Sequence, residues 1–330
     1  MKTLAIVGAT GLVGQTVLKV LEERDLPIDK YIFLASRRSV GREILFQHTL
    51  YKIKELTEKS FKGVDYAIFV AGSDVSKKYI PIAVSDNCIV IDNSSAYRLE
   101  KNVPLVVPEV NPKDIFSHNG ILANPNCSTI QSVIPLNVLK NNFGIKRVIY
   151  STYQAVSGAG QKGIEDFENT SKGLEPRKFP VPIYNNCIPQ IDTFLSNGYT
   201  KEEEKMVNET RKILDLPSLK ITATAVRVPV LNSHCVSANV ELERDFDVNE
   251  VIDLFNKQKG IVVKNNYPIP TEANRKDSVF IGRIRRDFSV ENGLNFWVVA
   301  DNLRKGAATN AVQILELLME ENERERVLYD

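Results

Sequence analysis

The chain has 330 residues, of which 43% are hydrophobic and 25% are charged, and its formal net charge is +1. These values are typical of a globular protein of about two domains, and the near-neutral charge gives no bulk attraction to nucleic acid or to an anionic membrane. No apolar run is long enough to span a bilayer, and the N-terminus enters a strand pattern without a signal-type leader. We therefore expect a cytoplasmic protein with no nucleic-acid or membrane partner.

Cysteine and histidine usage argues against structural metal and disulfide chemistry. The four cysteines show no CxxC pair and no regular spacing; they are Cys88, Cys127, Cys187 and Cys235. Such a pattern predicts neither a disulfide framework nor a thiolate zinc site. None of the three histidines stands at a metal-ligand spacing from another. We expect no metal.

The first predicted element is a short apolar strand, Leu4–Val7, which leads through a glycine-rich turn into an amphipathic helix. Gly8, Gly11 and Gly14 give the spacing GxxGxxG. Glycine lets backbone N–H groups approach a pyrophosphate, and the N-terminus of the helix stabilises the phosphate charge. The turn therefore predicts a dinucleotide site. Its candidate contact residues are Gly8, Thr10, Gly11, Leu12 and Val13.

The second predicted strand, residues 31–36, ends in the sequence Ser36-Arg37-Arg38-Ser39. Sites that prefer NAD usually carry an acidic residue at this position, where it binds the ribose 2′-hydroxyl. Two arginines and two serines suit a 2′-phosphate better, so we expect NADP to be bound, with Arg38 and Ser39 as contacts. A solvated basic turn is the alternative interpretation.

Further strand patterns alternate with helical stretches up to about residue 126, which predicts a doubly wound parallel sheet. These strands are expected at 66–70, 88–91 and 120–123. The pattern then changes to longer strands rich in β-branched and aromatic residues, which predicts a second, α+β domain around a mixed or antiparallel sheet. The longer strands are expected at 147–158, 220–230, 234–243 and 294–302.

The last stretch of the chain, 306–325, has the pattern of an amphipathic helix that returns to pack on the first domain. The expected fold class is therefore α/β with a second α+β domain. The first domain is predicted to comprise residues 1–126 and to be completed by the C-terminal helix, 306–330. The second is predicted to comprise residues 127–305.

Cys127 lies in the segment ILANPNCSTIQSV, on a polar turn between a predicted strand and the start of a helix. A cysteine kept for packing usually lies among apolar residues, whereas a thiolate at a helix start is favoured by the helix dipole and by free N–H groups. The local sequence leaves both roles open, a small buried side chain or a nucleophile.

Seven segments taken together resemble the aspartate-semialdehyde dehydrogenase family, in that family's order from the first strand to the last helix. They are GATGLVG, SSAYR (94–98), PNCST, STYQAVSGAGQKG (151–163), EEEKMVNETRKIL (202–214), RVPVLNSHCVSANVEL (227–242) and RKGAATNAVQI (304–314). The resemblance implies a Rossmann-type NADP-binding domain followed by an α+β catalytic and dimerisation domain. It also implies a homodimer or a dimer of dimers.

The activity implied by the resemblance is the reversible, NADP-dependent reductive dephosphorylation of L-aspartyl-4-phosphate to L-aspartate 4-semialdehyde. The partners are then a small-molecule substrate and inorganic phosphate, in the biosynthesis of lysine (through diaminopimelate), methionine and threonine. Cysteine suits this chemistry, because a thiolate displaces phosphate to form a thioester, which accepts one hydride and then expels the thiolate. Cys127 is the expected nucleophile.

The resemblance also assigns the remaining site residues. His234, seven residues after Arg227, is expected to be the acid/base, and Arg227 is expected to clamp the substrate's α-carboxylate with its planar fork. Gln154 is expected to hold the acyl portion or a water near Cys127, and Glu202 is expected to recognise the α-amino group. The expected phosphate ligands are Arg98 and Lys205. The expected contacts to the nicotinamide end of the cofactor are Ser157, Gly158 and Asn310.

Several of these residues also have an ordinary structural interpretation. Glu202 and Lys205 stand in a charged helical run that is otherwise typical of a solvated face, and Asn310 is equally suited to capping or packing the last helix. An isolated histidine on a strand, such as His234, is most often structural. Cys235 is no rival to Cys127, because strand alternation turns it away from His234.

Two other functions are compatible with parts of the pattern. N-acetyl-γ-glutamyl-phosphate reductase uses the same thioester chemistry on a homologous fold, but its substrate lacks a free α-amino group. The EEEK segment and the RVPV…SH arrangement favour the aspartyl substrate instead. A catalytically silent, NADP-sensing regulator would be marked by loss of Cys127 or His234, and both residues are present.

Overall fold

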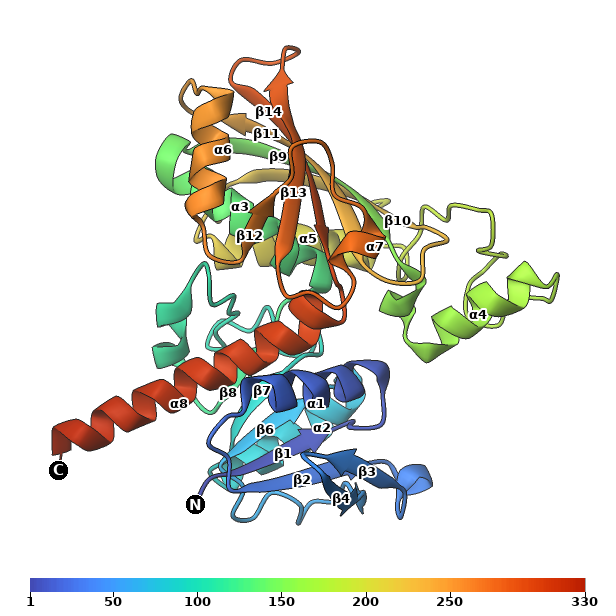
Figure 1. Ribbon diagram of the computed structural model, residues 1–330, viewed down its shortest axis with the longest axis vertical. Helices are drawn as coiled ribbons and strands as arrows, with labels where there is room; N and C mark the ends of the chain where they lie inside the picture. Colours follow the sequence, from blue (N-terminus) through green and yellow to red (C-terminus); the bar gives the residue numbers. More distant parts are fainter. Residues whose placement is uncertain (330) are drawn as a thin grey trace. The chain divides into compact units, whose positions relative to one another are not determined.

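The computed structural model describes residues 1–329, and it describes side chains through residue 320. The chain forms two compact units (Figure 1). The first comprises Met1–Pro125 and the C-terminal segment that begins at Ala307, and the second comprises Asn126–Gly306.

The first unit is built on a six-stranded sheet in the order β5-β2-β1-β6-β7-β8, with every neighbouring pair parallel. Its strands are β1 (Thr3–Val7), β2 (Lys30–Ala35), β5 (Lys54–Glu55), β6 (Tyr66–Phe69), β7 (Ile89–Asp92) and β8 (Ile121–Ala123). A separate antiparallel hairpin consists of β3 (Glu43–Phe46) and β4 (Thr49–Lys52). The predicted parallel α/β architecture is confirmed.

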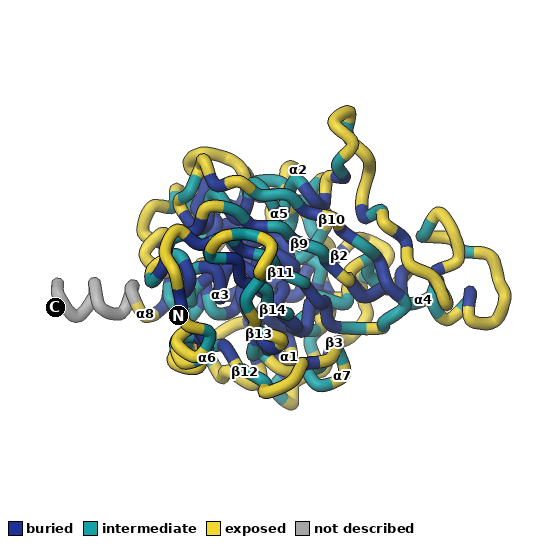
Figure 2. Tube along the Cα trace, turned by 90° about the horizontal axis from the view of Figure 1, so that it is seen from above, coloured by how far each residue is buried: buried dark blue, intermediate teal, exposed yellow. Residues whose placement is uncertain are grey.

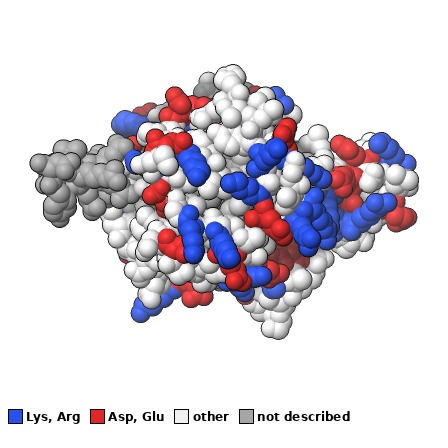
Figure 3. All heavy atoms as spheres, turned by 90° about the horizontal axis from the view of Figure 1, so that it is seen from below, with Lys and Arg blue, Asp and Glu red and all other residues white. Residues whose placement is uncertain are grey.

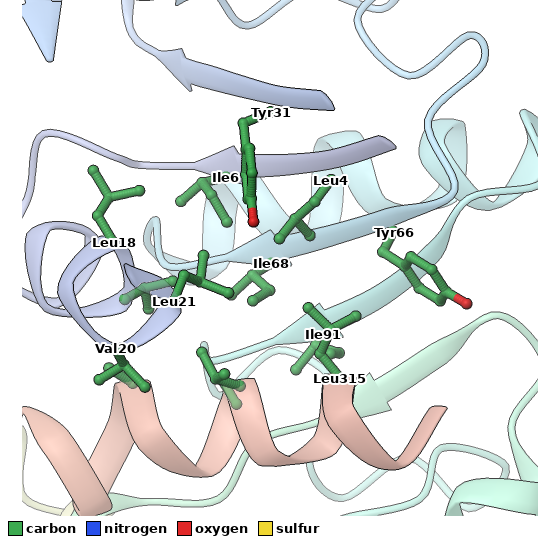
Figure 4. Packing of buried hydrophobic residues seen from close by; sticks show 14 of the residues in the cluster. Leu4, Ile6, Leu18, Val20, Leu21, Tyr31, Tyr66, Ile68, Ile91 and Leu315 are labelled. Carbon is green, nitrogen blue, oxygen red and sulfur yellow. The ribbon is translucent and has the colours of Figure 1, made fainter. Parts of the chain in front are cut away.

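Helices cover both faces of this sheet, which is why β1 is buried along its whole length. Helices α1 (Leu12–Arg24) and α8 (Thr309–Tyr329) cover one face, and α2 (Ser73–Ser85) covers the other. Figure 4 shows Leu4 and Ile6 of β1 packing with Leu21 of α1 and Leu315 of α8. The α-helical part of the last helix begins at Thr309 rather than at 306, because a π-helical turn, Arg304–Ala308, precedes it.

The second unit is built on a mixed six-stranded sheet in the order β10-β9-β11-β14-β13-β12. The strands are β9 (Ile145–Gln154), β10 (Lys220–Arg227), β11 (His234–Leu242), β12 (Ile261–Val263), β13 (Val279–Asp287) and β14 (Gly293–Ala300). The pairs β9–β10 and β12–β13 are parallel and the other three pairs are antiparallel. This confirms the predicted mixed sheet. β12 and β13 were not predicted, and β9 is shorter than the predicted 147–158 because Val156–Ala159 forms a 3₁₀ turn.

One face of the second sheet is covered by three helices, α3 (Cys127–Phe143), α5 (Lys201–Ile213) and α6 (Val248–Lys257). Against the other face the short helix α7 (Pro270–Ala273) packs near Cys235. Helix α4 (Gln161–Ser171) and the residues after it are largely exposed (Figure 2). In the second unit, helices therefore cover one face of the sheet, whereas the described residues of the unit cover the other face incompletely.

The charged residues of the chain are nearly balanced, with 42 Lys and Arg against 41 Asp and Glu. On the face drawn in Figure 3, basic and acidic side chains are interspersed, in keeping with the net charge of +1. Within residues 1–329, no helix combines the length and the apolar character that crossing a membrane requires. The described residues also contain no cluster of three or more histidine, cysteine or acidic side chains arranged to hold a metal ion.

Candidate active site

Strand register in the second unit brings three predicted site residues to one edge of the sheet. β9 ends at Gln154, whose register partner is Arg227 at the end of β10. β11 begins at His234, opposite Ala300 at the end of β14. Because β9 and β11 are antiparallel neighbours, the end of one lies beside the start of the other. Backbone pairing between the strands is therefore sufficient to bring Gln154, Arg227 and His234 to one edge of the sheet.

Cys127 is the first residue of α3, which packs on this sheet. Asn126 caps the helix, and its side-chain Oδ1 accepts hydrogen bonds from the backbone N–H groups of Ser128 (2.9 Å) and Thr129 (3.2 Å). The backbone of Gly306 lies against Cys127, since a Cβ added at Gly306 would stand 2.9 Å from the Cβ of Cys127. The partly buried side chain of Cys127 thus lies at the positive end of helix α3, where a thiolate is stabilised.

Glu202 is the centre of a buried polar network beside Cys127. Its Oε1 accepts from the side-chain amides of Asn126 (2.8 Å) and Gln154 (3.1 Å). Its Oε2 lies 3.3 Å from Nζ of Lys205. Burial alone raises the pKa of Glu202, but the charge of Lys205 and the two hydrogen bonds outweigh burial and lower the pKa below its ordinary value. Glu202 is therefore an ionised carboxylate at neutral pH.

Arg227 is a buried guanidinium with most of its donors unused. Its Nη1 donates to the carbonyl oxygen of Ala155 at 2.6 Å, and the described residues accept from none of its other N–H groups. The ring of Phe179 lies 5.9 Å from its Cζ. Burial lowers the pKa of Arg227, and the charges of Glu202 and Cys127 oppose that effect. The guanidinium stays charged, so its planar fork can bind a carboxylate.

His234 is held in one tautomer by the backbone. The N–H of Ala155 donates to Nδ1 at 3.0 Å, so the proton of the neutral ring is on Nε2. Nε2 is buried and has no hydrogen-bond partner among the described residues. Burial, followed by the charge of Arg227, lowers the pKa of His234 well below its ordinary value. The ring is therefore neutral and offers an N–H donor.

The turn after β9, Val156–Ala159, lies directly against Arg227 and His234. A Cβ added at Gly158 would stand 2.9 Å from Nη1 of Arg227 and 3.0 Å from Nε2 of His234. Only glycine allows this approach without displacing one of the two side chains. The neighbouring Ser157 is buried, and its hydroxyl accepts from the side chain of Asn302 at 3.0 Å. Cofactor contact by Ser157 and Gly158 stays a prediction.

Buried polar atoms without a hydrogen-bond partner are concentrated at the start of α3. Among the described residues they include Ser128 Oγ, Thr129 Oγ1 and Gln131 Oε1, in addition to His234 Nε2. The amide nitrogen of Gln131 donates to the backbone oxygen of His234 at 3.1 Å, which ties the helix to β11. Buried polar groups are normally paired, and a concentration of unpaired ones is typical of a ligand site.

The two predicted phosphate ligands belong to different units and each has protein partners. In the first unit, Arg98 is buried and donates to the carbonyl oxygens of Asn124 (2.9 Å) and Asn93 (2.8 Å), where β8 and β7 end. In the second unit, Nζ of Lys205 lies 2.8 Å from Asp192, in addition to its contact with Glu202. Their role toward phosphate stays a prediction.

The glycine turn of the first unit fits a dinucleotide phosphate. Gly8 has φ +92°, and a Cβ there would stand 2.9 Å from the carbonyl oxygen of Val70. A Cβ on Gly14 would stand 2.3 Å from the oxygen of Gly8, so the turn and α1 pack more closely than any larger residue allows. Thr10 and Gly11 are exposed at the start of α1, and no side chain caps this helix. The turn thus presents backbone N–H groups at a helix N-terminus.

The other predicted cofactor contacts of the first unit differ in exposure. Arg38 and Ser39 lie in a short 3₁₀ turn after β2, and Arg38 is exposed and forms no ion pair with the described residues. Asn310 is fully buried, and its side-chain amide donates to Val106 O (2.9 Å) and to Asn124 Oδ1 (2.7 Å). That is the packing role which the sequence left open for Asn310.

Three residues of the site were not predicted. Asn126 both caps α3 and binds Glu202, and its residue type, which is preferred at N-caps, was an available signal. Glu209 accepts a hydrogen bond from the backbone N–H of Asn126 at 2.6 Å. It lies seven residues after Glu202 on the same helix, which places both on one face. Nothing in the local sequence indicates the contact of Gly306 with Cys127.

Comparison with known proteins identifies relatives along the whole chain. A family model described as "Semialdehyde dehydrogenase, NAD binding domain" matches residues 3–118, and one described as "Semialdehyde dehydrogenase, dimerisation domain" matches residues 136–305. Aspartate-semialdehyde dehydrogenase from Aquifex aeolicus is 51% identical in an alignment 333 positions long, which covers 96% of this chain and 98% of the relative.

Solved structures agree with these matches. The crystal structure of aspartate semialdehyde dehydrogenase II from Vibrio cholerae, complexed with ASA, has a TM-score of 0.95 and 44% identity, covering 97% of this chain and 98% of that one. Aspartate semialdehyde dehydrogenase from Candida albicans, crystallised with NADP, has a TM-score of 0.77 and 25% identity, covering 98% of this chain and 99% of that one.

Proposed function

The chain belongs to the aspartate-semialdehyde dehydrogenase family, and on that premise we propose that it works through a covalent thioester on Cys127. The reaction is the reversible conversion of L-aspartyl-4-phosphate to L-aspartate 4-semialdehyde and phosphate. The observation that carries the proposal is Cys127 at the N-terminus of α3, in the unit that also assembles Gln154, Arg227 and His234 at one sheet edge. The pathway proposed for the product is the biosynthesis of lysine, methionine and threonine.

Cys127 is proposed to attack the acyl phosphate as a thiolate. The S–C bond forms as the C–O bond to phosphate breaks, and phosphate leaves with the bonding electron pair. The positive end of α3 and the charge of Arg227 both favour the thiolate. When bound, NADPH supplies the hydride that reduces the thioester. Cys127 then leaves as thiolate and the aldehyde is released.

His234 is proposed to donate a hydrogen bond to the carbonyl oxygen of the thioester, on which negative charge develops. The neutral ring carries its proton on Nε2 because Nδ1 is occupied by the Ala155 N–H. This geometry favours a donor role over abstraction of the thiol proton, which would require Nε2 to be unprotonated. The proposal therefore narrows the acid/base role expected from the sequence to that of a hydrogen-bond donor.

Arg227, Glu202 and Gln154 are proposed to fix the amino-acid end and the acyl group of the substrate. The unused donors of Arg227 suit the α-carboxylate. The ionised carboxylate of Glu202 suits the α-ammonium group, and Gln154 is held beside it by the hydrogen bond to Glu202 Oε1. Arg98 and Lys205 are proposed to bind phosphate, since a dianion calls for more than one cation.

Recognition of an α-ammonium group distinguishes the proposed activity from that of N-acetyl-γ-glutamyl-phosphate reductase. An N-acetylated substrate carries no positive charge at this position, so it offers the ionised carboxylate of Glu202 no charged partner. An α-ammonium group would instead form a charge-assisted hydrogen bond with Glu202, which is about twice as strong as a neutral one. The network around Glu202 therefore supports the aspartyl substrate.

Phosphate-dependent turnover tests the proposed function directly. Purified protein is incubated with L-aspartate 4-semialdehyde, phosphate and NADP, and NADPH formation is followed by absorbance. We expect kcat/KM to exceed that for N-acetyl-glutamate semialdehyde by about 10²-fold or more, because the analogue lacks the α-ammonium group that Glu202 is proposed to bind. Binding of NADP without phosphate-dependent NADPH formation would instead identify a silent regulator.

NADP is proposed as the cofactor, bound by the glycine turn and by Arg38 and Ser39. Replacing Arg38 with alanine is expected to raise KM for NADP by about 10- to 100-fold, because a charge-assisted bond to the 2′-phosphate is lost. KM for NAD should change by less than about threefold. Arg42→Ala, at a nearby exposed position, is the control. Equal losses with both cofactors would argue against 2′-phosphate recognition.

A homodimer is proposed, with the second copy covering the incompletely covered sheet face of the second unit. The matched dimerisation domain, residues 136–305, includes this sheet. Its outer face carries Tyr153, 40% exposed, with its ring centroid 5.3 Å from that of the half-buried Trp297. Sedimentation of the purified protein checks the proposal, and a monomer at micromolar concentration would contradict it.

Location of the protein in the cytoplasm stays a prediction.

A further inference from the structure

Asn126, the residue before the nucleophile, is held by helix α5 at two points. Its side-chain amide donates to Oε1 of Glu202 (2.8 Å), and its backbone N–H donates to Oε2 of Glu209 (2.6 Å). The two carboxylates are seven residues apart, which is about two turns of helix, so they lie on one face of α5. Asn126 is thereby attached to α5 through both backbone and side chain.

Glu209 replaces a local capping interaction by a long-range one. In a capping box, the backbone N–H of the N-cap residue is bound by an acidic side chain at the third helical position. That position of α3 is occupied by Thr129, and the acceptor comes instead from Glu209, 83 residues away in the chain. Glu209 is 1% exposed, so the bond forms in a dry environment, where it is strong.

We propose that Glu209 is a positioning residue for the nucleophile: it fixes the Asn126 peptide and, through it, the direction in which Cys127 presents its sulfur. Helix α5 then has two roles: Glu209 positions Cys127, and Glu202 and Lys205 of the same helix are proposed to bind the substrate. Catalysis is sensitive to such placement, because a displacement of about 1 Å can lower a rate about 10²-fold. The inference rests on the proposed role of Cys127.

Two conservative variants of Glu209 distinguish the effect of the position of its acceptor oxygen from the effect of its charge. Glu209→Gln keeps the length of the side chain and an acceptor oxygen but removes the charge, whereas Glu209→Asp keeps the charge and withdraws the acceptor by one methylene. We expect kcat to stay within about threefold of wild type in Glu209→Gln and to fall about 30-fold or more in Glu209→Asp. KM for phosphate should change little in either. Glu204→Gln and Glu204→Asp, on the same helix and bound to Asn197, are the matched controls.

A second readout does not depend on turnover. Alkylation of Cys127 by iodoacetamide, followed by peptide mass spectrometry without substrate, reports on the sulfur itself, and the exposed Cys187 is the internal reference. We expect Glu209→Asp to change the Cys127 rate at least about fivefold while Cys187 is unaffected. An inactive Glu209→Gln beside an active Glu209→Asp would overturn the proposal, as would unchanged labelling in both. If wild type lacks phosphate-dependent activity but the labelling differs as expected, the proposed function fails and the positioning role stands.

Discussion

Replacing Cys127 with serine is expected to lower kcat by about 10⁴-fold or more, with the Kd for NADP changed by less than about twofold. A serine hydroxyl is a poor nucleophile near neutral pH without a strong base, and His234 is held with its proton on the nitrogen that would have to accept one. An oxygen ester would also release its alkoxide much less readily than a thioester releases a thiolate. Steady-state kinetics and NADP titration by fluorescence check both parts.

The remaining cysteines supply the control for this prediction. Cys187→Ser changes an exposed thiol and is expected to leave kcat within about twofold. Cys235 is a poorer control, because it lies in an apolar cluster with Phe280 and Val299, where burial raises the pKa of its thiol to about 12. That environment also makes Cys235 unreactive, as expected from its opposite orientation to His234. More than about 1% residual activity in Cys127→Ser would exclude the thioester mechanism.

Replacing His234 is expected to separate hydrogen-bond donation from proton abstraction. His234→Ala removes the Nε2–H donor and should lower kcat about 10²- to 10³-fold, the usual cost of losing an oxyanion donor. His234→Gln retains an N–H donor but has no basic nitrogen. Its kcat should therefore be at least about tenfold higher than that of His234→Ala. Steady-state kinetics of both variants provides the measurement.

The pH dependence follows from the lowered pKa of His234. In the native protein the ring is neutral above this lowered pKa, so the neutral donor is present throughout the range around the ordinary value of 6.5. We therefore expect no fall in wild-type kcat assignable to His234 as pH decreases from 7.5 to about 6. An acidic limb centred near 6.5 that disappears in His234→Gln, together with equal activities of the Gln and Ala variants, would show that His234 acts as a base.

The glycine turn and the central strands of the first unit were predictable because their signals are local, whereas the hairpin β3–β4 and the short strand β5 were not predicted. The glycine spacing of residues 8–14 predicts the turn, since the close contacts of Gly8 and Gly14 need residues without a Cβ. Strand ends were less certain. β9 was expected to reach residue 158 but ends at Gln154, because the backbone groups of Ala155 bind His234 and Arg227 instead of a neighbouring strand. Hydrogen bonds to side chains from other strands override local strand propensity there.

Within the site, residue types were predictable and their partners were not. The resemblance named Glu202, but its ionised state depends on Lys205, Asn126 and Gln154, which tertiary packing brings together. The contact of Gly306 with Cys127 and that of Glu209 with Asn126 join positions far apart in the chain. No local pattern contains such pairs, so only the folded chain reveals them.

From the sequence by itself follow the fold class, the dinucleotide turn and the family, because strand and helix periods, glycine spacings and short motifs are properties of neighbouring residues. Tertiary structure alone decided the tautomer of His234, the ionisation of Glu202 and the attachment of Asn126 to α5. These depend on burial and on hydrogen bonds between distant segments, and both arise only when the sheet and its helices have packed.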